Sequence, residues 1–353
     1  MFFISNLFFF NLIFFNFFFK HLKIFEILTI IIPLLINIAY FTLIERKIIA
    51  LIQLRKGPNI LGIKGLLQPL VDGLKLILKE NTVPTNVDIF IYFLAPIFTF
   101  TLSLLSWAII PLDFSYVYSN INMGILYLLS ISSLGVYGII LAGWSSNSKY
   151  AFLGAIRSTA QMISYEICLS LILIIIIIYV GSFNLIDIII SQQAIWFIIP
   201  FFPLFIMFFF GVLAETNRTP FDLPEAEGEL VAGFFVEYSS TGFALFFLGE
   251  MSNILLMSSF IVILFFGGWL NPFLFLENWL NSFLFFLLIN IPNYIIFILK
   301  ILFILFLFIL VRATLPRYRY DQLMNLIWKN FLPLTIGLLI FYTSIILFFN
   351  FLN

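Results

Sequence analysis

Six carboxylates and one cation lie close together near the middle of the sequence, between residues 214 and 238. The acidic residues are Glu215, Asp222, Glu225, Glu227, Glu229 and Glu237, and the cation is Arg218. Charged residues make up only 10% of the chain, so the segment concentrates like charge. Crowded carboxylates raise one another's pKa, and burial acts in the same direction. These residues are therefore suited to holding and passing protons near neutral pH.

A solvated acidic loop is the ordinary explanation for such a cluster in a soluble protein. Here long apolar runs flank the segment on both sides, so it lies at or in a membrane. An ionised carboxylate at the centre of a bilayer costs about 2.5–3.5 kcal/mol on insertion scales. One arginine cannot neutralise six such groups. We therefore predict that residues 214–238 form a functional site.

The composition of the chain indicates which elements position this site. Hydrophobic residues make up 63% of the sequence, phenylalanine alone numbers 49, and the mean hydropathy is +1.16. A helix that crosses a bilayer needs about 20 predominantly apolar residues. We expect an all-α fold, a polytopic transmembrane helical bundle with eight transmembrane helices. The expected spans are residues 24–44, 88–111, 123–143, 158–180, 194–213, 240–266, 289–311 and 331–350.

Two segments outside these spans need separate predictions. Residues 1–23 form a Phe-rich N-terminal extension, and we leave open whether the run 2–19 crosses the membrane. Residues 24–353 are expected to form a single transmembrane domain. Within it, residues 65–80 place apolar side chains along one stripe of a helix and polar ones along the other. This segment is too short to cross a bilayer, so we predict an in-plane amphipathic helix.

The distribution of cations predicts how the bundle is oriented. Of the 17 Lys and Arg residues, 14 lie in alternate loops, and the connections on the opposite side carry none. Cytoplasmic or matrix loops of membrane proteins carry an excess of Lys and Arg. The loops expected on that side are residues 45–87, 144–157, 214–239 and 312–330.

The sequence offers few ligands for a redox centre. Cys168 is the only cysteine and His21 the only histidine, so no disulfide can form within the chain. An iron–sulfur cluster or a complete haem ligand set cannot be assembled from these residues alone. If the protein takes part in redox chemistry, electrons must arrive from another subunit. The formal net charge is zero, which gives no argument for a nucleic-acid partner.

Glu45, at the end of the first predicted span, and Glu166 and Glu250, within later spans, are further candidates. An ionisable residue inside a membrane is expensive and is by default a candidate functional residue. Lys47, next to Glu45, has the simpler explanation of an anchor at the lipid headgroups. The lone Cys168, in an apolar run, is expected to be a packing residue.

Several of these segments carry motifs of a known family. They are Glu45-Arg46-Lys47, Gln53 to Glu80, Ser145 to Tyr150, Ala160-Gln161, Ser164-Tyr165-Glu166, Ala214 to Tyr238, Phe243 to Glu250 and Arg312 to Met324. In these motifs the chain resembles the subunit 1 family of respiratory complex I, the proton-pumping NADH:ubiquinone oxidoreductase. The match runs in order over about residues 24 to 350. Two departures are the longer N-terminal extension and Met251, where the family commonly has an aromatic residue.

The resemblance implies a function and a set of partners. Ubiquinone would be the substrate, with NADH, FMN and iron–sulfur clusters in partner subunits and no metal, flavin or cluster bound by this chain. The partners would be quinone-site subunits of the peripheral arm, neighbouring antiporter-like subunits of the membrane arm, and membrane phospholipids. The location would be the mitochondrial inner membrane or, alternatively, a bacterial plasma membrane. The heavy use of Phe, Ile, Leu and Asn suggests an AT-rich, organellar genome.

The resemblance also assigns roles to residues. The quinone channel would include Arg46, Arg55, Phe221, Phe235 and Arg312. The proton path would include Glu45, Asp72, Glu166, Glu215, Glu225, Glu227, Glu229, Glu237 and Glu250. Contact with the peripheral arm would involve Arg218, Asp222, Arg317, Arg319 and Asp321.

Two other functions use the same residue types. A stand-alone proton-coupled transporter would also need acids inside the membrane, although we find none of the internal repeats that many transporters show. A related hydrogenase membrane subunit would share part of the motifs without reducing quinone. The predicted function is the quinone-binding and coupling subunit of a redox-driven proton pump.

Overall fold

The computed structural model describes residues 2–114, 117–222, 231–272 and 292–352, with side chains described between residues 27 and 348 of these ranges. Within them the regular structure is entirely helical. The helices are α1 (Phe2–Ile52), α2 (Gln68–Leu78), α3 (Ile89–Ser106), α4 (Gly124–Ser145), α5 (Lys149–Val180), α6 (Leu185–Ser191), α7 (Phe202–Glu215), α9 (Ser240–Phe265), α11 (Asn293–Thr314), α12 (Tyr320–Asn325) and α13 (Leu332–Leu352). Short helical turns add η1 (Ile63–Gly65), η2 (Trp107–Ile109), η3 (Gly233–Phe235) and the π-helical η5 (Leu326–Phe331).

The predicted fold class is confirmed: the chain is a multi-pass helical bundle. Among the described residues, seven helical stretches are long and apolar enough to cross a membrane. The predicted span 194–213 differs, because only α7, of 14 residues, is helical there without a break. Pro203 lies in the first turn of α7, where its fixed φ favours a helix start. The predicted total of eight spans therefore stays a prediction.

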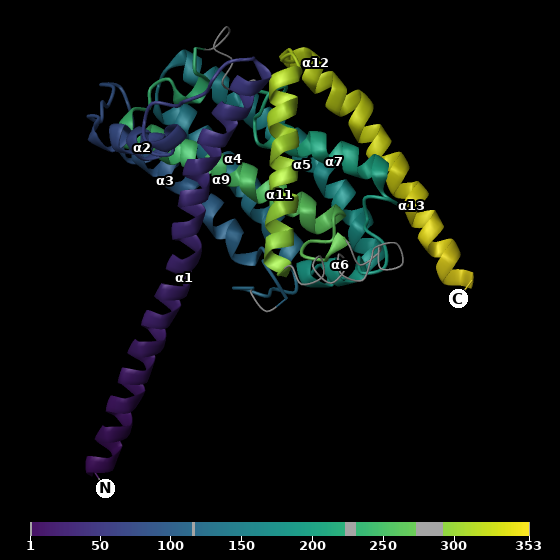
Figure 1. Cartoon of the computed structure of the whole chain (residues 1–353), viewed down its shortest axis with the longest axis horizontal. Helices are drawn as coiled ribbons and strands as arrows, with labels where there is room; N and C mark the ends of the chain where they lie inside the picture. The colour runs from purple at the N-terminus through teal and green to yellow at the C-terminus, as the bar shows by residue number, and fades with distance from the viewer. Residues whose placement is uncertain (1, 115–116, 223–230, 273–291, 353) are drawn as a thin grey trace.

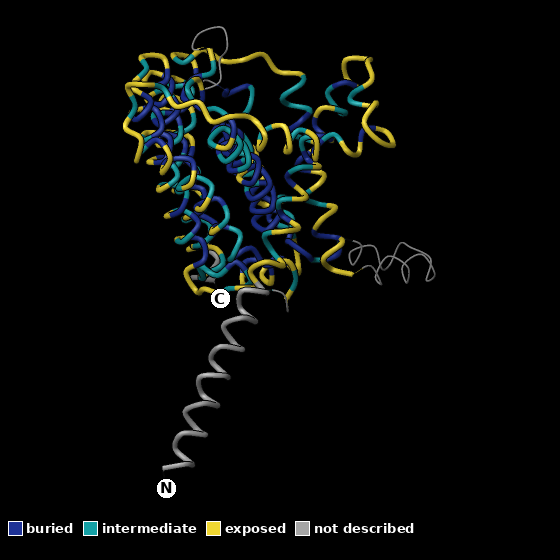
Figure 2. Tube along the Cα trace, turned by 90° about the vertical axis from the view of Figure 1, so that its left-hand side faces the viewer, coloured by how far each residue is buried: buried dark blue, intermediate teal, exposed yellow. Residues whose placement is uncertain are grey.

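Helix α9 occupies the centre of the bundle. It packs against α1, α2, α3, α6, α7 and α11, and most of its side chains are buried. Gly249, Ser252, Ser258 and Ser259 are small residues on this helix, and small residues let neighbouring membrane helices approach closely. Figure 2 shows the buried residues gathered along the inner sides of the helices.

Helix α1 is a single helix from Phe2 to Ile52. Its 51 residues correspond to about 77 Å at 1.5 Å per residue, whereas the hydrocarbon core is about 30 Å thick. Figure 1 shows its N-terminal half extending away from the other helices. The predicted N-terminal extension and the first predicted span thus belong to one continuous helix.

Helix α2 lies within the predicted in-plane segment. Its 11 residues are about 16 Å long, which is too short to cross a bilayer. Leu70, Leu74 and Ile77 leave an apolar stripe exposed, while Asp72 on the other side bonds to Arg46 of α1. The contacts of α2 with α1 and α9 attach it to one end of the bundle. Its position in the plane of the membrane stays a prediction.

The C-terminal helices cover one side of the bundle. After α11, the short α12 and the π-helical η5 lead into α13, which packs against α5. The hydroxyl of Tyr342 on α13 donates to the carbonyl of Pro200 at 3.0 Å. In Figure 1, α11 and α13 run away from α12 in different directions.

Candidate functional site

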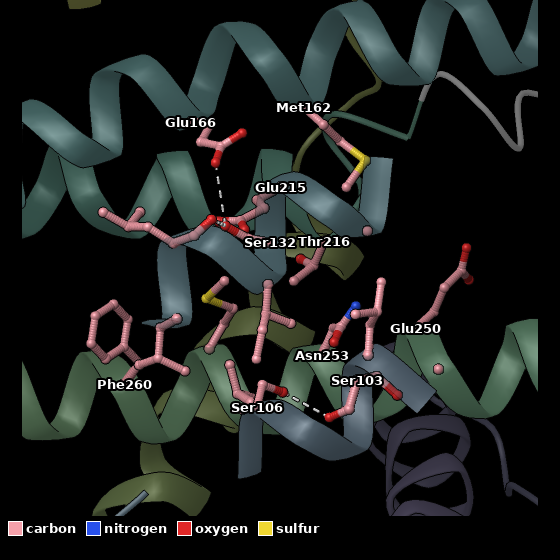
Figure 3. Close-up of a pocket in the computed structure, with 18 of the residues that line it drawn as sticks. Ser103, Ser106, Ser132, Met162, Glu166, Glu215, Thr216, Glu250, Asn253 and Phe260 are labelled. Atoms are coloured by element: carbon pink, nitrogen blue, oxygen red, sulfur yellow. Dashed lines mark hydrogen bonds between the residues drawn. The ribbon is translucent and has the colours of Figure 1, made fainter. Parts of the chain in front are cut away.

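A cavity of about 110 Å³ lies inside the bundle, between α3, α4, α5, α7 and α9. Three acids from three helices line it: Glu166 on α5, Glu215 at the end of α7 and Glu250 on α9. In Figure 3 the carboxyl groups of Glu166 and Glu215 lie near each other and that of Glu250 lies apart from them, with Ser103, Ser132 and Asn253 among the polar side chains drawn. The volume has room for several water molecules, which polar walls would hold. The fold therefore brings together three of the predicted proton-path residues.

Within the cavity, Glu166 and Glu215 form the closest association of acids. Ser132 on α4 donates a long hydrogen bond of 3.5 Å to Oε1 of Glu166. Glu215 is close enough to Glu166 for their charges to interact. In Figure 3 the carboxyl group of Glu166 points toward Ser132 and Glu215. Two like charges that lie close together in a low-dielectric site repel each other strongly.

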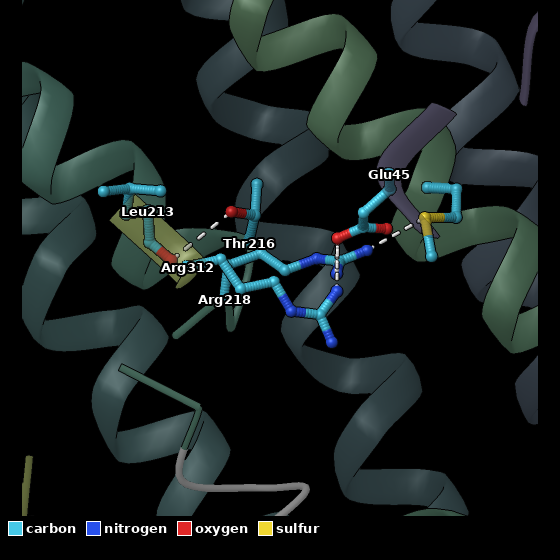
Figure 4. A network of polar contacts seen from close by, with 6 residues as sticks. Glu45, Leu213, Thr216, Arg218 and Arg312 are labelled. Carbon is cyan, nitrogen blue, oxygen red and sulfur yellow. Dashed lines mark hydrogen bonds and ion pairs between the residues drawn. The ribbon is translucent and has the colours of Figure 1, made fainter. Parts of the chain in front are cut away.

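A second polar group joins three segments that are far apart in sequence (Figure 4). Glu45, near the C-terminal end of α1, is only 6% exposed. Its Oε1 accepts a hydrogen bond from Nη1 of Arg218 at 2.9 Å and another from Nη1 of Arg312. Arg218 also directs Nη2 at the sulfur of Met251, at 2.9 Å. We call Glu45, Arg218 and Arg312 the Glu45 network.

Two pairs of consecutive residues bring the cavity lining next to Arg218 of the Glu45 network. Asn217 lines the cavity, and the next residue, Arg218, bonds to Glu45. On α9, Glu250 lines the cavity, and the next residue, Met251, contacts Arg218. Arg218 is therefore joined to the cavity lining directly through the backbone at Asn217 and by its contact with the residue after Glu250.

Gln161 on α5 holds the segment that follows α7. Its side chain is fully buried, with 0% of its surface exposed. Its Nε2 donates to the carbonyls of Ala214 and Phe221 at 2.7 and 2.8 Å, and lies 3.3 Å from Oδ1 of Asn217. The sequence signal for this role is an amide five residues before Glu166 in an otherwise apolar helix. Sequence reasoning placed Gln161 in a motif and missed this function.

The segment that leads into the acidic loop is also fastened to the loop before α12. Nη2 of Arg317 donates to Oδ2 of Asp222 at 2.8 Å. The ring of Tyr318 stacks on Phe221 with 5.6 Å between centroids and 10° between planes. The backbone N–H of Tyr318 donates to the carbonyl of Pro220 at 3.0 Å. These contacts give the residues before 223 a defined position.

Comparison with known proteins places the chain in a family. The family model described as NADH dehydrogenase matches residues 25–343. The chain belongs to the NADH dehydrogenase family. This confirms the resemblance drawn from the motifs.

Curated relatives match over nearly their whole length. The NADH-ubiquinone oxidoreductase chain 1 of Chondrus crispus is 58% identical over 327 residues, covering 93% of this chain and 97% of that protein. Chain 1 of Arabidopsis thaliana is 58% identical over 312 residues, covering 88% and 93%. A bacterial NADH-quinone oxidoreductase subunit, from Paramagnetospirillum magneticum, is 54% identical over 329 residues, covering 93% of this chain and 93% of that protein.

The two aromatic residues predicted for the quinone channel are buried. Phe221 lies between the rings of Tyr165 and Tyr318. Phe235 is part of a ring cluster with Phe234, Phe243 and Phe246. Among the residues that the structure describes, neither ring lines the cavity. Their predicted role in the channel stays a prediction.

Of the arginines predicted for the quinone channel, Arg46 bonds to α2 and Arg55 follows the end of α1. Nη1 of Arg46 donates to Oδ2 of Asp72 at 2.8 Å, and Nε2 of Gln68 donates to Oδ1 of Asp72 at 2.9 Å. Nε of Arg55 donates to Oε1 of Gln53 at 2.8 Å. The side chains of Arg46 and Arg55 reach solvent, so this group faces outward and is separate from the cavity lining.

The remaining predicted residues have different positions. Arg319 and Asp321 are exposed at the start of α12. Glu237 is half-buried, and its backbone carbonyl accepts a hydrogen bond from the Tyr92 hydroxyl at 2.7 Å. Burial raises the pKa of the neighbouring Tyr238 hydroxyl, which lies 3.4 Å from Ser145 Oγ. Glu225, Glu227 and Glu229 lie outside the described residues.

One half-buried cation was not singled out by the sequence. Lys300, within α11, donates from Nζ to the carbonyls of Phe266, Gly268 and Leu270 at 2.8, 2.9 and 2.7 Å. These carbonyls follow the C-terminal end of α9, where a cation is favourable. The Nζ atom also lies 4.4 Å from the ring centroid of Trp196. Lys300 therefore connects the end of α9 to α11. In the sequence it lies far from the acids that line the cavity.

The described residues show no cluster that would hold a metal. No group of three or more His, Cys, Asp and Glu side chains is arranged to bind an ion within the described part of the chain. Cys168, a residue of α5, is buried in the hydrophobic core. The groups in the cavity lining that can exchange protons are the carboxyl groups of Glu166, Glu215 and Glu250.

Proposed function

We propose that this chain is a membrane subunit of a NADH:quinone oxidoreductase. In this proposal residues 24–353 act as one membrane domain. The domain forms part of the quinone channel at the junction with the electron-donating subunits, and it couples quinone reduction to proton translocation. The names of the relatives and the match over almost their whole length support the enzyme class. The location that fits the chain 1 relatives is the mitochondrial inner membrane.

The observation that carries the coupling role is the cavity with three acids. Glu166, Glu215 and Glu250 come from three different helices and line one cavity. A hydrated space with carboxyl groups at its walls allows protons to move between them over short distances. Carboxylic acids buried in a membrane bundle are otherwise costly, and such residues characteristically mark proton relays.

The reaction supplies the reason for a proton relay. Reduction of a quinone to a quinol takes up two electrons and two protons. The electrons would come from NADH through flavin and iron–sulfur centres of partner subunits. This chain supplies acids and cations around the quinone, and the negative charge that forms there in a low-dielectric site must be matched by protons. Repulsion between this charge and the acids shifts the preferred positions of their protons.

The Glu45 network links the proposed channel side to the cavity. Arg312 is predicted for the channel, and it bonds to Glu45 together with Arg218. Arg218 is consecutive with cavity-lining Asn217. A change of charge near Arg312 therefore reaches the cavity through one carboxylate and one arginine. In this proposal the exposed Arg319 and Asp321 contact the peripheral arm, and the acids of residues 223–230 extend the proton path.

Two alternative functions are less well supported. A stand-alone transporter does not account for a match of 97% of the length of a respiratory-enzyme chain. A hydrogenase membrane subunit would use similar acids without reducing quinone. Purification distinguishes these possibilities, since our proposal requires a large assembly that contains flavin and iron–sulfur centres and reduces ubiquinone.

The coupling role is tested by the variant Glu166→Gln in the assembled enzyme. The amide keeps the shape of the side chain and removes the exchangeable proton. We expect assembly at normal levels and loss of both quinone reduction and proton pumping, as we also expect for Glu227→Gln. Reduction of an artificial acceptor by the upstream flavin should stay normal.

A matched control is Asp187→Asn, which neutralises an exposed acid at the start of α6. It should leave both activities unchanged. If Glu166→Gln and Glu227→Gln reduce quinone and pump protons at wild-type rates, the acids have a structural role only and the coupling proposal is wrong.

A further inference from the structure

Residues 237–241, which we call the junction segment, connect the turn η3 to the start of α9. Each of these five residues is bonded to or stacked on another part of the chain. Their partners lie mainly between the last turn of α2 and the first turn of α3, at residues 76–92. The junction segment is therefore the place where the short surface helix α2 is attached to the central helix α9.

Ser240 makes the contact with α2 itself. Its Oγ shares its hydrogen between the carbonyls of Leu76 and Lys79, at 2.9 and 2.6 Å. Helix α2 ends at Leu78, and the last four carbonyls of a helix have no partner within it. The serine hydroxyl therefore satisfies carbonyls that the end of α2 would otherwise leave open.

The neighbours of Ser240 bond to the residues just after α2. Oγ of Ser239 accepts hydrogen bonds from the backbone N–H and the hydroxyl of Thr82, both at 2.9 Å. The backbone N–H and the hydroxyl of Thr241 both donate to Oδ1 of Asn81, at 3.2 and 3.0 Å. Three consecutive residues of the junction segment thus hold the chain that leaves α2.

The beginning of the junction segment is held by α3. The ring of Tyr238 stacks on Tyr92 with 4.3 Å between centroids and 3° between planes. The hydroxyl of Tyr92 donates to the backbone carbonyl of Glu237 at 2.7 Å. The segment is therefore fixed on both sides of Ser240.

The backbone of Ser240 is in the left-handed region, with φ of 51°. A residue other than glycine adopts this region infrequently and at a cost, and it persists where the surrounding contacts determine it. Ser240 is 2% exposed and its side chain bonds to α2. Glycine would relieve the strain and lose the hydroxyl, so the presence of serine here points to a requirement for the hydroxyl.

We propose that Ser240 is a positioning residue, which holds the C-terminal end of α2 on the start of α9. The other side of α2 is held by the ion pair of Asp72 with Arg46. Glu250 follows Ser240 by ten residues on the same helix and lines the cavity. We call the hydrogen bonds from Ser240 to Leu76 and Lys79 the clamp. The clamp therefore sets the position of α2 relative to Glu250. The inference rests on the proposed function, because α2 bonds to Arg46, which is predicted for the quinone channel, and Glu250 belongs to the proposed proton path.

Two variants in the assembled enzyme test this proposal. Ser240→Ala and Ser240→Gly both remove the hydroxyl, and Ser240→Gly also relieves the backbone strain, so it keeps the test available if the alanine variant fails to assemble. The first measurement is hydrogen exchange of the backbone amides of residues 76–82. The second is the pair of constants KM and kcat for a short-chain ubiquinone. Loss of the hydrogen bonds to the carbonyls of Leu76 and Lys79 predicts amide exchange faster by about tenfold and a KM raised roughly three- to tenfold, with kcat within about twofold.

The matched control is Ser258→Ala on the same helix. Ser258 is fully buried, and its hydroxyl donates to the carbonyl of Leu255 in its own helix, at 2.7 Å. This variant should leave both measurements unchanged. Unchanged exchange at residues 76–82 in both Ser240 variants would overturn the clamp. Faster amide exchange at residues 76–82 together with a wild-type KM would show that the clamp has no role in quinone binding. Because exchange is measured without quinone turnover, failure of the clamp is distinguishable from failure of the proposed function.

Discussion

Replacing Glu45 is the most direct test of the Glu45 network, because both arginines bond to this carboxylate. Arg218 is largely buried, with 15% of its side chain exposed, whereas 35% of the Arg312 side chain is exposed. Glu45→Leu leaves a buried guanidinium without its carboxylate, and breaking a buried ion pair in this way costs about 3–5 kcal/mol. Because Arg312 keeps part of its hydration, we expect the lower end of this range, about 3 kcal/mol.

Glu45→Gln is the milder variant, because its amide oxygen still accepts from both arginines. Hydrogen bonds to a charged partner are about twice as strong as neutral ones, so we expect a loss of about 1–2 kcal/mol. The assay is the rate of irreversible heat inactivation of quinone reduction in the purified enzyme. A change of about 1.36 kcal/mol in the activation free energy corresponds to a tenfold change in rate. Glu45→Leu should therefore accelerate inactivation roughly tenfold more than Glu45→Gln.

A double-mutant cycle decides whether the network acts as a unit. Arg312→Gln in the Glu45→Gln background should cost less than it does in the wild type, because the bond has already been weakened. Distant, independent sites are additive within about 0.3–0.5 kcal/mol. Additivity of Glu45→Gln and Arg312→Gln within this range would refute the network. The exposed Glu80 provides the control, and Glu80→Gln should not change the inactivation rate.

Two further variants test how the site is held together. Gln161→Leu removes the amide donor from the carbonyls of Phe221 and Ala214, of which Ala214 keeps the backbone N–H of Asn217. We expect a loss of about 1–3 kcal/mol, seen as faster heat inactivation, and a wild-type rate would contradict the role of this amide. Gly154→Ala would place Cβ 2.8 Å from Cα of Gly233, so α5 and η3 must separate at a cost of about 1–3 kcal/mol in the same assay. Gly73→Ala is its control, because nothing lies within 4 Å of the added Cβ, and equal effects of the two alanines would exclude the steric explanation.

The helical bundle follows directly from the sequence because apolar length is a local property. Each predicted span except 194–213 coincides in part with a described long helix, and the amphipathic period of residues 65–80 anticipated α2. The start of α7 was misplaced because apolar composition alone does not record that Pro200 and Pro203 restrict where a helix begins. The ends of helices depend on such single residues, whereas their existence depends on many.

The candidate site was predictable only as separate residues. The acids stand out in an apolar sequence, so Glu45, Glu166 and Glu250 were identified individually. Their partners were not, since Arg218 and Arg312 are 173 and 267 residues away from Glu45 in the chain. Tertiary packing sets such pairs, and no local pattern contains it. The role of Gln161 was hidden for the same reason, because its partners are backbone carbonyls of another segment.

The neighbours Glu250 and Met251 have a consequence for the way α9 tolerates change. Successive residues of a helix point about 100° apart, so one of these side chains faces the cavity and the other faces Arg218. An insertion of one residue in α9 before Glu250 would turn the acid away from the cavity, whereas most point substitutions on the helix would leave its direction unchanged. Helical phase is therefore a separate requirement of this site, and sequence length between Ser240 and Glu250 should be more restricted than residue identity.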